Sequence, residues 1–149
     1  HLARFPSSPV KELLDLKLRK VRLVAVVHKD LPVENIDELS KLSLGRERPF
    51  RVASEYVNIA DKYARENHLG YYWIIPTWGA TEAFLPEDAD MLIENTETGK
   101  TIALHNLKII DTLFYSTACL IGNTGKNSET KKARIDYIVN KLTAAVAEA

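Results

Sequence analysis

The sequence predicts an α/β domain with a mostly parallel or mixed sheet and flanking helices. Short β-branched apolar runs, which are typical of buried strands, recur along the 149-residue chain. Segments with helical spacing of apolar residues lie between most of these runs, and this alternation favours strands covered by helices. Hydrophobic residues make up 46% of the chain and charged residues 27%, so there is enough apolar material for a core.

The first elements follow from simple patterns. Residues 1–10 hold two prolines and two serines and predict an extended leading segment. Residues 10–18 fit either a short helix or a strand. The run at 20–29, "KVRLVAVVHK", is β-branched and bounded by charges, which indicates a buried strand. Residues 31–42 place Pro32 early and leucines on one face, which predicts a short helix.

The middle of the chain continues the alternation. Residues 49–56, "PFRVASEY", predict a second strand. Residues 55–70 carry apolar side chains at helical spacing, and Gly70 is the expected C-terminal stop of that helix. The aromatic and β-branched run at 71–78, "YYWIIPTW", predicts a third strand.

Turns and short helices separate the next strands. Residues 79–88 begin with a glycine turn and predict a short helix that Pro86 ends. Residues 89–95, "ADMLIEN", predict a strand. Residues 96–107 predict a turn that runs into a helix, with Thr98 as the capping residue.

The end of the chain predicts more sheet and a long helix. Residues 107–123, "LKIIDTLFYSTACLIGN", predict one or two strands. Residues 129–149 show a helical stripe of apolar side chains, and Ser128 is positioned to cap this final helix.

The charge balance excludes some partners. The chain holds 20 Lys and Arg and 20 Asp and Glu, so its net charge is zero. No bulk attraction to nucleic acid or to an anionic membrane follows, and any anion site must be local. The basic residues Lys17, Arg19, Lys20 and Arg22 alternate with apolar residues, and we interpret them as strand edges.

Cysteine and histidine patterns indicate neither disulfides nor a metal cluster. Cys119 is the only cysteine, which fits a reducing, cytoplasmic compartment, and its apolar surroundings predict a buried small hydrophobe. His28, His68 and His105 are not spaced as metal ligands. We therefore predict no protein metal site, and no apolar stretch approaches the ~20 residues that span a membrane.

Two loops have the composition of a ligand site. In open α/β sheets, ligands bind beyond the carboxyl ends of the strands, where loops enter helices. One candidate loop follows the strand at 71–78 and contains Gly79, Ala80, Thr81 and Glu82. The other runs from Glu94 to Thr101.

The second loop has two interpretations. Gly99 permits a tight turn, Thr98 and Thr101 offer hydroxyls, and Lys100 offers a positive charge, which together suit a phosphate. Glu94, just upstream, suits sugar hydroxyls or Mg²⁺. The alternative is an ordinary helix cap, for which Thr and Gly are also common. The first glycine of the nucleotide P-loop is absent, because position 94 is Glu.

The chain resembles ATP phosphoribosyltransferase from Glu12 to the last helix. The resemblance rests on five segments in family order: "ELLDLKLRKVRLVAVV", "FRVASEYVNIADKY", "GATEAF", "DADMLIENTETGKTIALHNLKIID" and "STACLIGN". The most specific piece is Glu94 with the Thr98–Thr101 turn, followed by "HNL". Glu94 stands where many members carry Asp, and "LPED" replaces a glycine-containing loop.

The resemblance implies a function and a set of site residues. The reaction joins ATP to phosphoribosyl pyrophosphate (PRPP) with Mg²⁺ as cofactor, in the first step of histidine biosynthesis. Glu94 is then the catalytic acid near the ribose, Asp90 supports it, and residues 79–82 line a cleft between two lobes. The implied residues for the 5-phosphate are Glu97, Thr98, Gly99, Lys100 and Thr101.

The resemblance also implies an organisation. The family has two lobes of the periplasmic-binding-protein type II fold, and this chain corresponds to the second. Residues 1–20 are then the remnant of a first lobe, 21–112 the PRPP-binding lobe, and 113–149 a return strand and C-terminal helix. We expect a homo-oligomer or a complex with the missing lobe or a regulatory subunit. The alternative is a non-catalytic anion-binding or solute-binding lobe, or a regulatory relic.

Overall fold

The computed structural model describes residues 9–79, 81–125 and 127–148. They fall into two units. The first, which we call the sheet unit, comprises residues 21–115. The second, which we call the hairpin unit, comprises the described residues of 1–20 and 116–149. Both candidate loops belong to the sheet unit.

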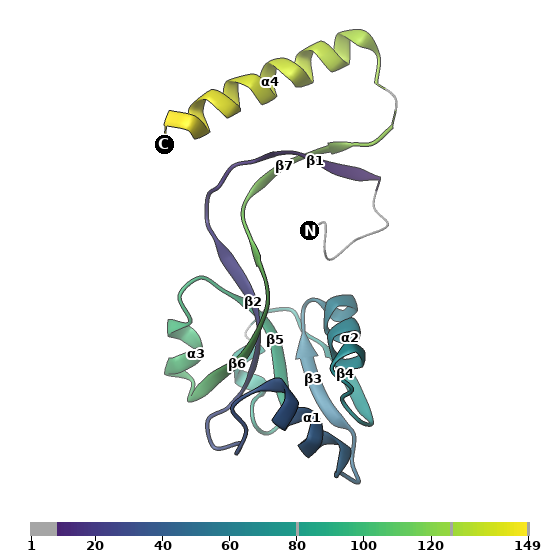
Figure 1. Ribbon diagram of the computed structural model, residues 1–149, viewed down its shortest axis with the longest axis vertical. Helices are drawn as coiled ribbons and strands as arrows, with labels where there is room; N and C mark the ends of the chain where they lie inside the picture. Colours follow the sequence, from purple (N-terminus) through teal and green to yellow (C-terminus); the bar gives the residue numbers. More distant parts are fainter. Residues whose placement is uncertain (1–8, 80, 126, 149) are drawn as a thin grey trace. The chain divides into compact units, whose positions relative to one another are not determined.

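The sheet unit contains a five-stranded mixed sheet in the order β4-β3-β5-β2-β6 (Figure 1). β3 pairs in parallel with both β4 and β5, whereas β2 pairs antiparallel with β5. The predicted mostly parallel or mixed sheet with flanking helices is thereby confirmed. The strands are β2 (Val21–His28), β3 (Phe50–Ser54), β4 (Tyr72–Pro76), β5 (Met91–Thr96) and β6 (Leu107–Ser116).

Helices cover both faces of this sheet. Successive side chains of a strand point to opposite faces of the sheet, so β2 contributes to a hydrophobic core on each face. Leu23, Ala25 and Val27 belong to one core, and Val24 and Val26 belong to the other. The first core includes residues of α1 (Ile36–Leu44) and α2 (Val57–Glu66). The second includes residues in and around η1 (Thr81–Phe84) and α3 (Lys100–Leu104). Burial of β2 on both faces explains its continuous apolar sequence.

Local chemistry sets where α1 begins. The Asn35 side chain accepts a hydrogen bond from the Glu38 N–H at 3.0 Å, and the Glu38 carboxylate accepts one from the Glu34 N–H at 2.7 Å. This reciprocal cap satisfies donors that a helix start leaves unpaired. The helix therefore begins at Ile36, after the bends at residues 31–35, rather than at residue 31.

Gly70 has a different role from the one predicted. α2 ends at Glu66 with Asn67 as its C-cap, so Gly70 lies beyond the helix end. A Cβ on Gly70 would lie 3.1 Å from the Ser43 carbonyl oxygen, and the Gly70 N–H donates to the Ser43 hydroxyl at 3.0 Å. Glycine is needed there for a close approach to α1, because a side chain would collide with backbone.

The hairpin unit pairs two strands that lie far apart in sequence. β1 (Val10–Asp15) runs antiparallel to β7 (Cys119–Asn123), so residues 10–18 begin as a strand rather than a helix. α4 (Glu129–Glu148) follows, and the Ser128 hydroxyl accepts a long hydrogen bond, 3.4 Å, from the Lys131 N–H. The described helices include none that is long and apolar enough to cross a membrane.

Candidate functional site

The candidate site lies where the parallel strands of the sheet unit end. β3, β4 and β5 are parallel, so their carboxyl ends share one edge of the sheet (Figure 1). Both predicted loops start at this edge, one after β4 and one after β5. This edge is the usual ligand position in open α/β sheets.

The loop after β4 is held by buried hydroxyls. The Thr77 N–H donates to the Ser54 carbonyl at 3.2 Å, which ties the loop to the end of β3. The hydroxyls of Thr77 and Thr81, both buried, lie 3.1 Å apart. Gly79 has a φ of +80°, a conformation that favours glycine. Ala80 lies outside the described residues.

The loop after β5 is shorter than predicted. β5 continues to Thr96, so Glu94 is a strand residue, and the turn itself consists of residues 97–99. The Thr96 hydroxyl accepts the Gly99 N–H at 2.9 Å and holds the turn closed. Gly99 leads into α3 with a φ of +76°.

The predicted cap of α3 is wrong. Gly99 is the N-cap residue, and no side chain caps this end. The Thr98 hydroxyl reaches only the Lys100 N–H, at a long 3.4 Å. Glycine is the N-cap residue because the backbone there adopts the left-handed conformation, which is unfavourable for threonine. The Thr98 hydroxyl is therefore left beside the turn rather than engaged in a helix cap.

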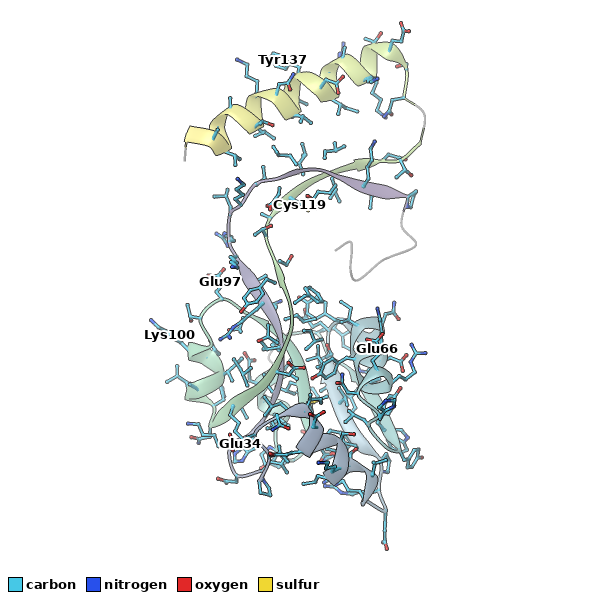
Figure 2. The ribbon with its side chains drawn as sticks, viewed as in Figure 1. Glu34, Glu66, Glu97, Lys100, Cys119 and Tyr137 are labelled. Atoms are coloured by element: carbon cyan, nitrogen blue, oxygen red, sulfur yellow. The ribbon has the colours of Figure 1, made fainter. Side chains whose placement is uncertain are left out.

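A cavity of about 300 Å³ lies against this turn. Thr101 and Ile102 are in the first turn of α3, so their N–H groups have no acceptor within the helix. Neither Gly99 nor Lys100 is among the described residues that line the cavity. Lys100 is exposed, and in Figure 2 its side chain points away from the ribbon. The lining residues are Glu82, Asn95, Thr96, Glu97, Thr98, Thr101 and Ile102.

Glu94 precedes the turn, on β5, and lies in an acidic environment. Its carboxylate accepts hydrogen bonds from the Asn95 N–H, at 2.8 Å, and from Thr81. Burial raises the pKa of Glu94 above its ordinary value, and the negative charges of Glu82 and Glu55 add to the increase. These interactions bring predicted residues of both loops together, because Glu82 and Thr81 come from the first loop and Glu94 precedes the second.

Asp90 has a structural role, which corrects the prediction that it supports Glu94. It precedes β5, about 13 Å from Glu94 along an extended strand. Its carboxylate accepts hydrogen bonds from the Arg51 backbone N–H at 2.8 Å and from Arg51 Nε at 3.2 Å. Arg46 Nη1 lies 3.1 Å from Asp90 Oδ1 and forms an ion pair with it. Among the described residues, this nitrogen has no hydrogen-bond partner of good geometry. Burial opposes ionisation of Asp90, but the bonds from Arg51 and the charge of Arg46 outweigh it and lower the pKa of Asp90.

Arg22 is a site neighbour that sequence reasoning missed. We interpreted it as a strand-edge charge, but its register partner on β5 is Thr96. Arg22 Nη2 lies 3.5 Å from the point that a Cβ of Gly99 would occupy. In the sequence, Arg22 stands two residues before Val24 on a strand that is buried on both faces. Its side chain and that of Val24 therefore lie on the same face of the sheet, the face that α3 covers.

The part of the chain that the structure describes contains no group of three His, Cys, Asp or Glu side chains arranged to hold a metal ion. Carboxylates are nevertheless present at the cavity, in Glu82 and Glu97, with Glu94 close to Glu82. The site can therefore contribute one or two carboxylates to an ion that brings other ligands with it.

Solved structures share the fold. An ATP phosphoribosyl transferase (HisG:HisZ) complex from Thermotoga maritima superposes with a TM-score of 0.79 at 20% identity, over 99% of this chain and 67% of that one. A periplasmic transporter superposes with a TM-score of 0.62 at 12% identity, over 98% of this chain and 58% of that one. The fold is thus that of a periplasmic-binding-protein type II lobe.

Sequence relatives carry one name. ATP phosphoribosyltransferase from Saccharolobus solfataricus is 32% identical over 95% of this chain and 47% of its own length. The protein of that name from Prosthecochloris aestuarii is 32% identical over 87% of this chain and 41% of its own length. The chain thus spans about half the length of these curated relatives. The family model described as HisG, ATP phosphoribosyltransferase, matches residues 5–144, so this chain belongs to the ATP phosphoribosyltransferase family.

Proposed function

We propose that this chain is the PRPP-binding lobe of an ATP phosphoribosyltransferase. That reaction forms a bond from N1 of the ATP adenine to C1 of PRPP, and the C1–O bond to pyrophosphate breaks with its electron pair. The observation that carries the proposal is the cavity against the turn after β5, in a chain of this family. The same cavity explains why threonines and glycine gather at this turn.

The turn is proposed to anchor the 5-phosphate of PRPP. The hydroxyls of Thr98 and Thr101 and the unpaired N–H groups of Thr101 and Ile102 supply donors at the cavity. Gly99 sets the turn, while Lys100 adds its charge from outside. Glu97 lines the cavity, and its backbone forms part of the turn. Anchoring the phosphate would hold C1 in line with the adenine nitrogen, which reduces the entropic part of the barrier.

Glu94 is proposed to orient the ribose hydroxyls. Its carboxylate is partly desolvated and lies near two other negative charges, so it gains by accepting hydrogen bonds from incoming hydroxyls. Residues 79–82 would border the cleft that faces the other substrate, with Glu82 at the cavity. No covalent protein nucleophile is required by this reaction.

The acids at the cavity fit Mg²⁺ carried by the substrate. Mg²⁺ prefers one or two carboxylates together with phosphate oxygens and water, rather than a protein cage. Glu82 and Glu94 could supply those carboxylates, and the described residues offer no larger ligand set. When bound, the ion would neutralise the leaving pyrophosphate.

The full reaction is proposed to need more than this chain. ATP would bind to a region of the relatives that lies outside the matched half. A complex with a regulatory subunit, in the manner of the HisG:HisZ complex from Thermotoga maritima, or a homo-oligomer would complete the assembly. We propose a cytoplasmic location on the same basis. The organisation into a remnant at 1–20, a lobe at 21–112 and a return segment at 113–149 stays a prediction.

A second candidate is a lobe that binds an anion or a solute without catalysis. It is favoured by the fold, which the periplasmic transporter shares. Both candidates predict ligand binding, and they differ in turnover. With ATP, PRPP and Mg²⁺, the enzyme hypothesis predicts pyrophosphate release once the part of a family relative that this chain does not match is supplied as a second protein. Binding of PRPP with no release in that mixture would favour the second candidate.

Calorimetry with PRPP and Mg²⁺ tests the site directly. We expect PRPP to bind, ribose 5-phosphate to compete with it, and unphosphorylated ribose to compete at least about tenfold less well, because the phosphate makes the charge-assisted contacts. If ribose competes as well as its phosphate, the turn after β5 does not bind phosphate and the proposal is wrong.

A further inference from the structure

Arg22 lies directly beneath the turn after β5. β2 and β5 are antiparallel neighbours, and Arg22 pairs with Thr96, so the two side chains share one face of the sheet. Thr96 lines the cavity and holds the Gly99 N–H. The Arg22 guanidinium and the Ile109 side chain both lie 3.5 Å from the point where a Cβ of Gly99 would be. The Arg22 charge is therefore placed against the backbone of the turn.

The cavity needs such a charge. The described residues that line it include two carboxylates, Glu82 and Glu97, and no Lys or Arg. A phosphate dianion placed there would be repelled unless a nearby cation offset these acids. Lys100 is exposed and points away, so solvent screens it.

Arg22 is suited to supply that charge. It is half-buried, and within the described ranges no carboxylate lies at ion-pair distance from it. Its charge is therefore not neutralised by a described acid, and partial burial reduces screening by salt. The arginines around Asp90, in contrast, are engaged with that carboxylate.

We propose that Arg22 is a positioning residue of the phosphate site. From beneath the turn, its guanidinium holds the backbone of residues 96–99 in place and offsets Glu82 and Glu97, so that the doubly charged form of a phosphate monoester binds. This inference rests on the proposed function. It adds Arg22, which lies outside the Thr98–Thr101 segment, as the residue that selects the charge state of the ligand.

Two variants of Arg22 and one control test the role. Arg22→Gln removes the charge, and Arg22→Lys keeps it. The control, Arg65→Gln, removes an arginine charge from α2, on the other face of the sheet. Binding of ribose 5-phosphate is measured by calorimetry between pH 5 and 8. We expect Arg22→Gln to weaken binding about tenfold at pH 8, as for loss of one charge-assisted interaction. Arg65→Gln should bind like the unmodified chain.

The pH dependence separates this role from a merely structural one. A phosphate monoester takes its second charge near pH 6, so affinity in the unmodified chain should rise through that pH. The rise should be lost in Arg22→Gln and kept in Arg22→Lys. If Arg22→Gln does not fold, loss of the rise in Arg22→Lys overturns the proposal.

The outcomes also separate this inference from the proposed function. If the unmodified chain binds ribose 5-phosphate and Arg22→Gln keeps both its affinity and its pH profile, Arg22 has no role but the phosphate site stands. If the unmodified chain binds neither ribose 5-phosphate nor PRPP, the proposed function fails, and the role of Arg22 fails with it.

Discussion

The two ends of β5 carry acids in opposite situations. Asp90, before the first residue of the strand, is surrounded by Arg46, Arg48 and Arg51, and its pKa is lowered. Glu94, near the other end, has no arginine among its described partners, faces other acids, and has a raised pKa. Three residues of β5, Met91, Leu92 and Ile93, therefore separate a carboxylate that is stabilised as a charge from one that is not.

This difference distinguishes a structural acid from a site acid. A carboxylate whose hydrogen bonds and charge are satisfied within the protein has little to offer a ligand. A carboxylate that is desolvated beside an open cavity still has unsatisfied bonding capacity, and such groups gather at functional sites. The sequence shows both as acids flanking one apolar strand, and only their neighbours separate them.

The largest expected effect is at the turn that makes the Glu94 end a site. Gly99→Val should abolish PRPP and phosphate binding, with a loss of about 100-fold or more, because a β-branched residue is strongly disfavoured at a φ of +76°. Calorimetry measures the loss, and far-UV circular dichroism should show the fold retained. Gly45→Val, at a φ of −84°, is the matched control and should bind normally. Unchanged affinity in Gly99→Val would show that this turn is not the binding element.

The next effect is at the Asp90 end and concerns stability. Asp90→Asn leaves Arg46 and Arg51 without their partner and should lower the free energy of unfolding by about 3 kcal/mol at pH 7. Because the folded pKa of Asp90 is lowered, its stabilising contribution is present above pH ~4 and is lost as the pH falls through the folded pKa.

Urea unfolding at pH 7 and at pH 3 measures this prediction. The difference between Asp90→Asn and the unmodified chain should narrow at the lower pH, and binding of ribose 5-phosphate at pH 7 should be unaffected. Loss of phosphate binding in a folded Asp90→Asn variant would mean that the two ends of β5 are not independent.

The smallest expected effect has the opposite sign. The folded pKa of Glu94 is raised, so its favourable contribution exists below its unfolded pKa of ~4.3 and is lost as the pH rises through the folded value. Glu94→Gln removes this desolvated charge and should raise the free energy of unfolding by about 1 kcal/mol at pH 7, while weakening binding of PRPP. Thermal unfolding from pH 4 to 8 checks this, and a variant less stable than the parent at pH 7 would contradict it.

Much of the fold is predictable because the signals are local. The β-branched run at 20–29 and the apolar run at 89–95 match β2 and β5 closely, since burial on both faces demands continuous apolar residues. The position of Gly99 and its threonines after an apolar strand likewise places the candidate turn at the sheet edge. The helix boundaries near Thr98 and Gly70 were less predictable, because a cap or a close approach depends on the conformation reached and on residues far away in sequence.

The sequence by itself determined an α/β lobe, its buried strands and a threonine-glycine turn at the end of one of them, because each depends on neighbouring residues. Tertiary structure alone decided that Asp90 serves three arginines and that Arg22 lies under Gly99. The physical reason is register: β2 and β5 are about seventy residues apart along the chain, and only their antiparallel pairing puts Arg22 opposite Thr96. The charge that faces a site is therefore set by which strands pair and in which alignment.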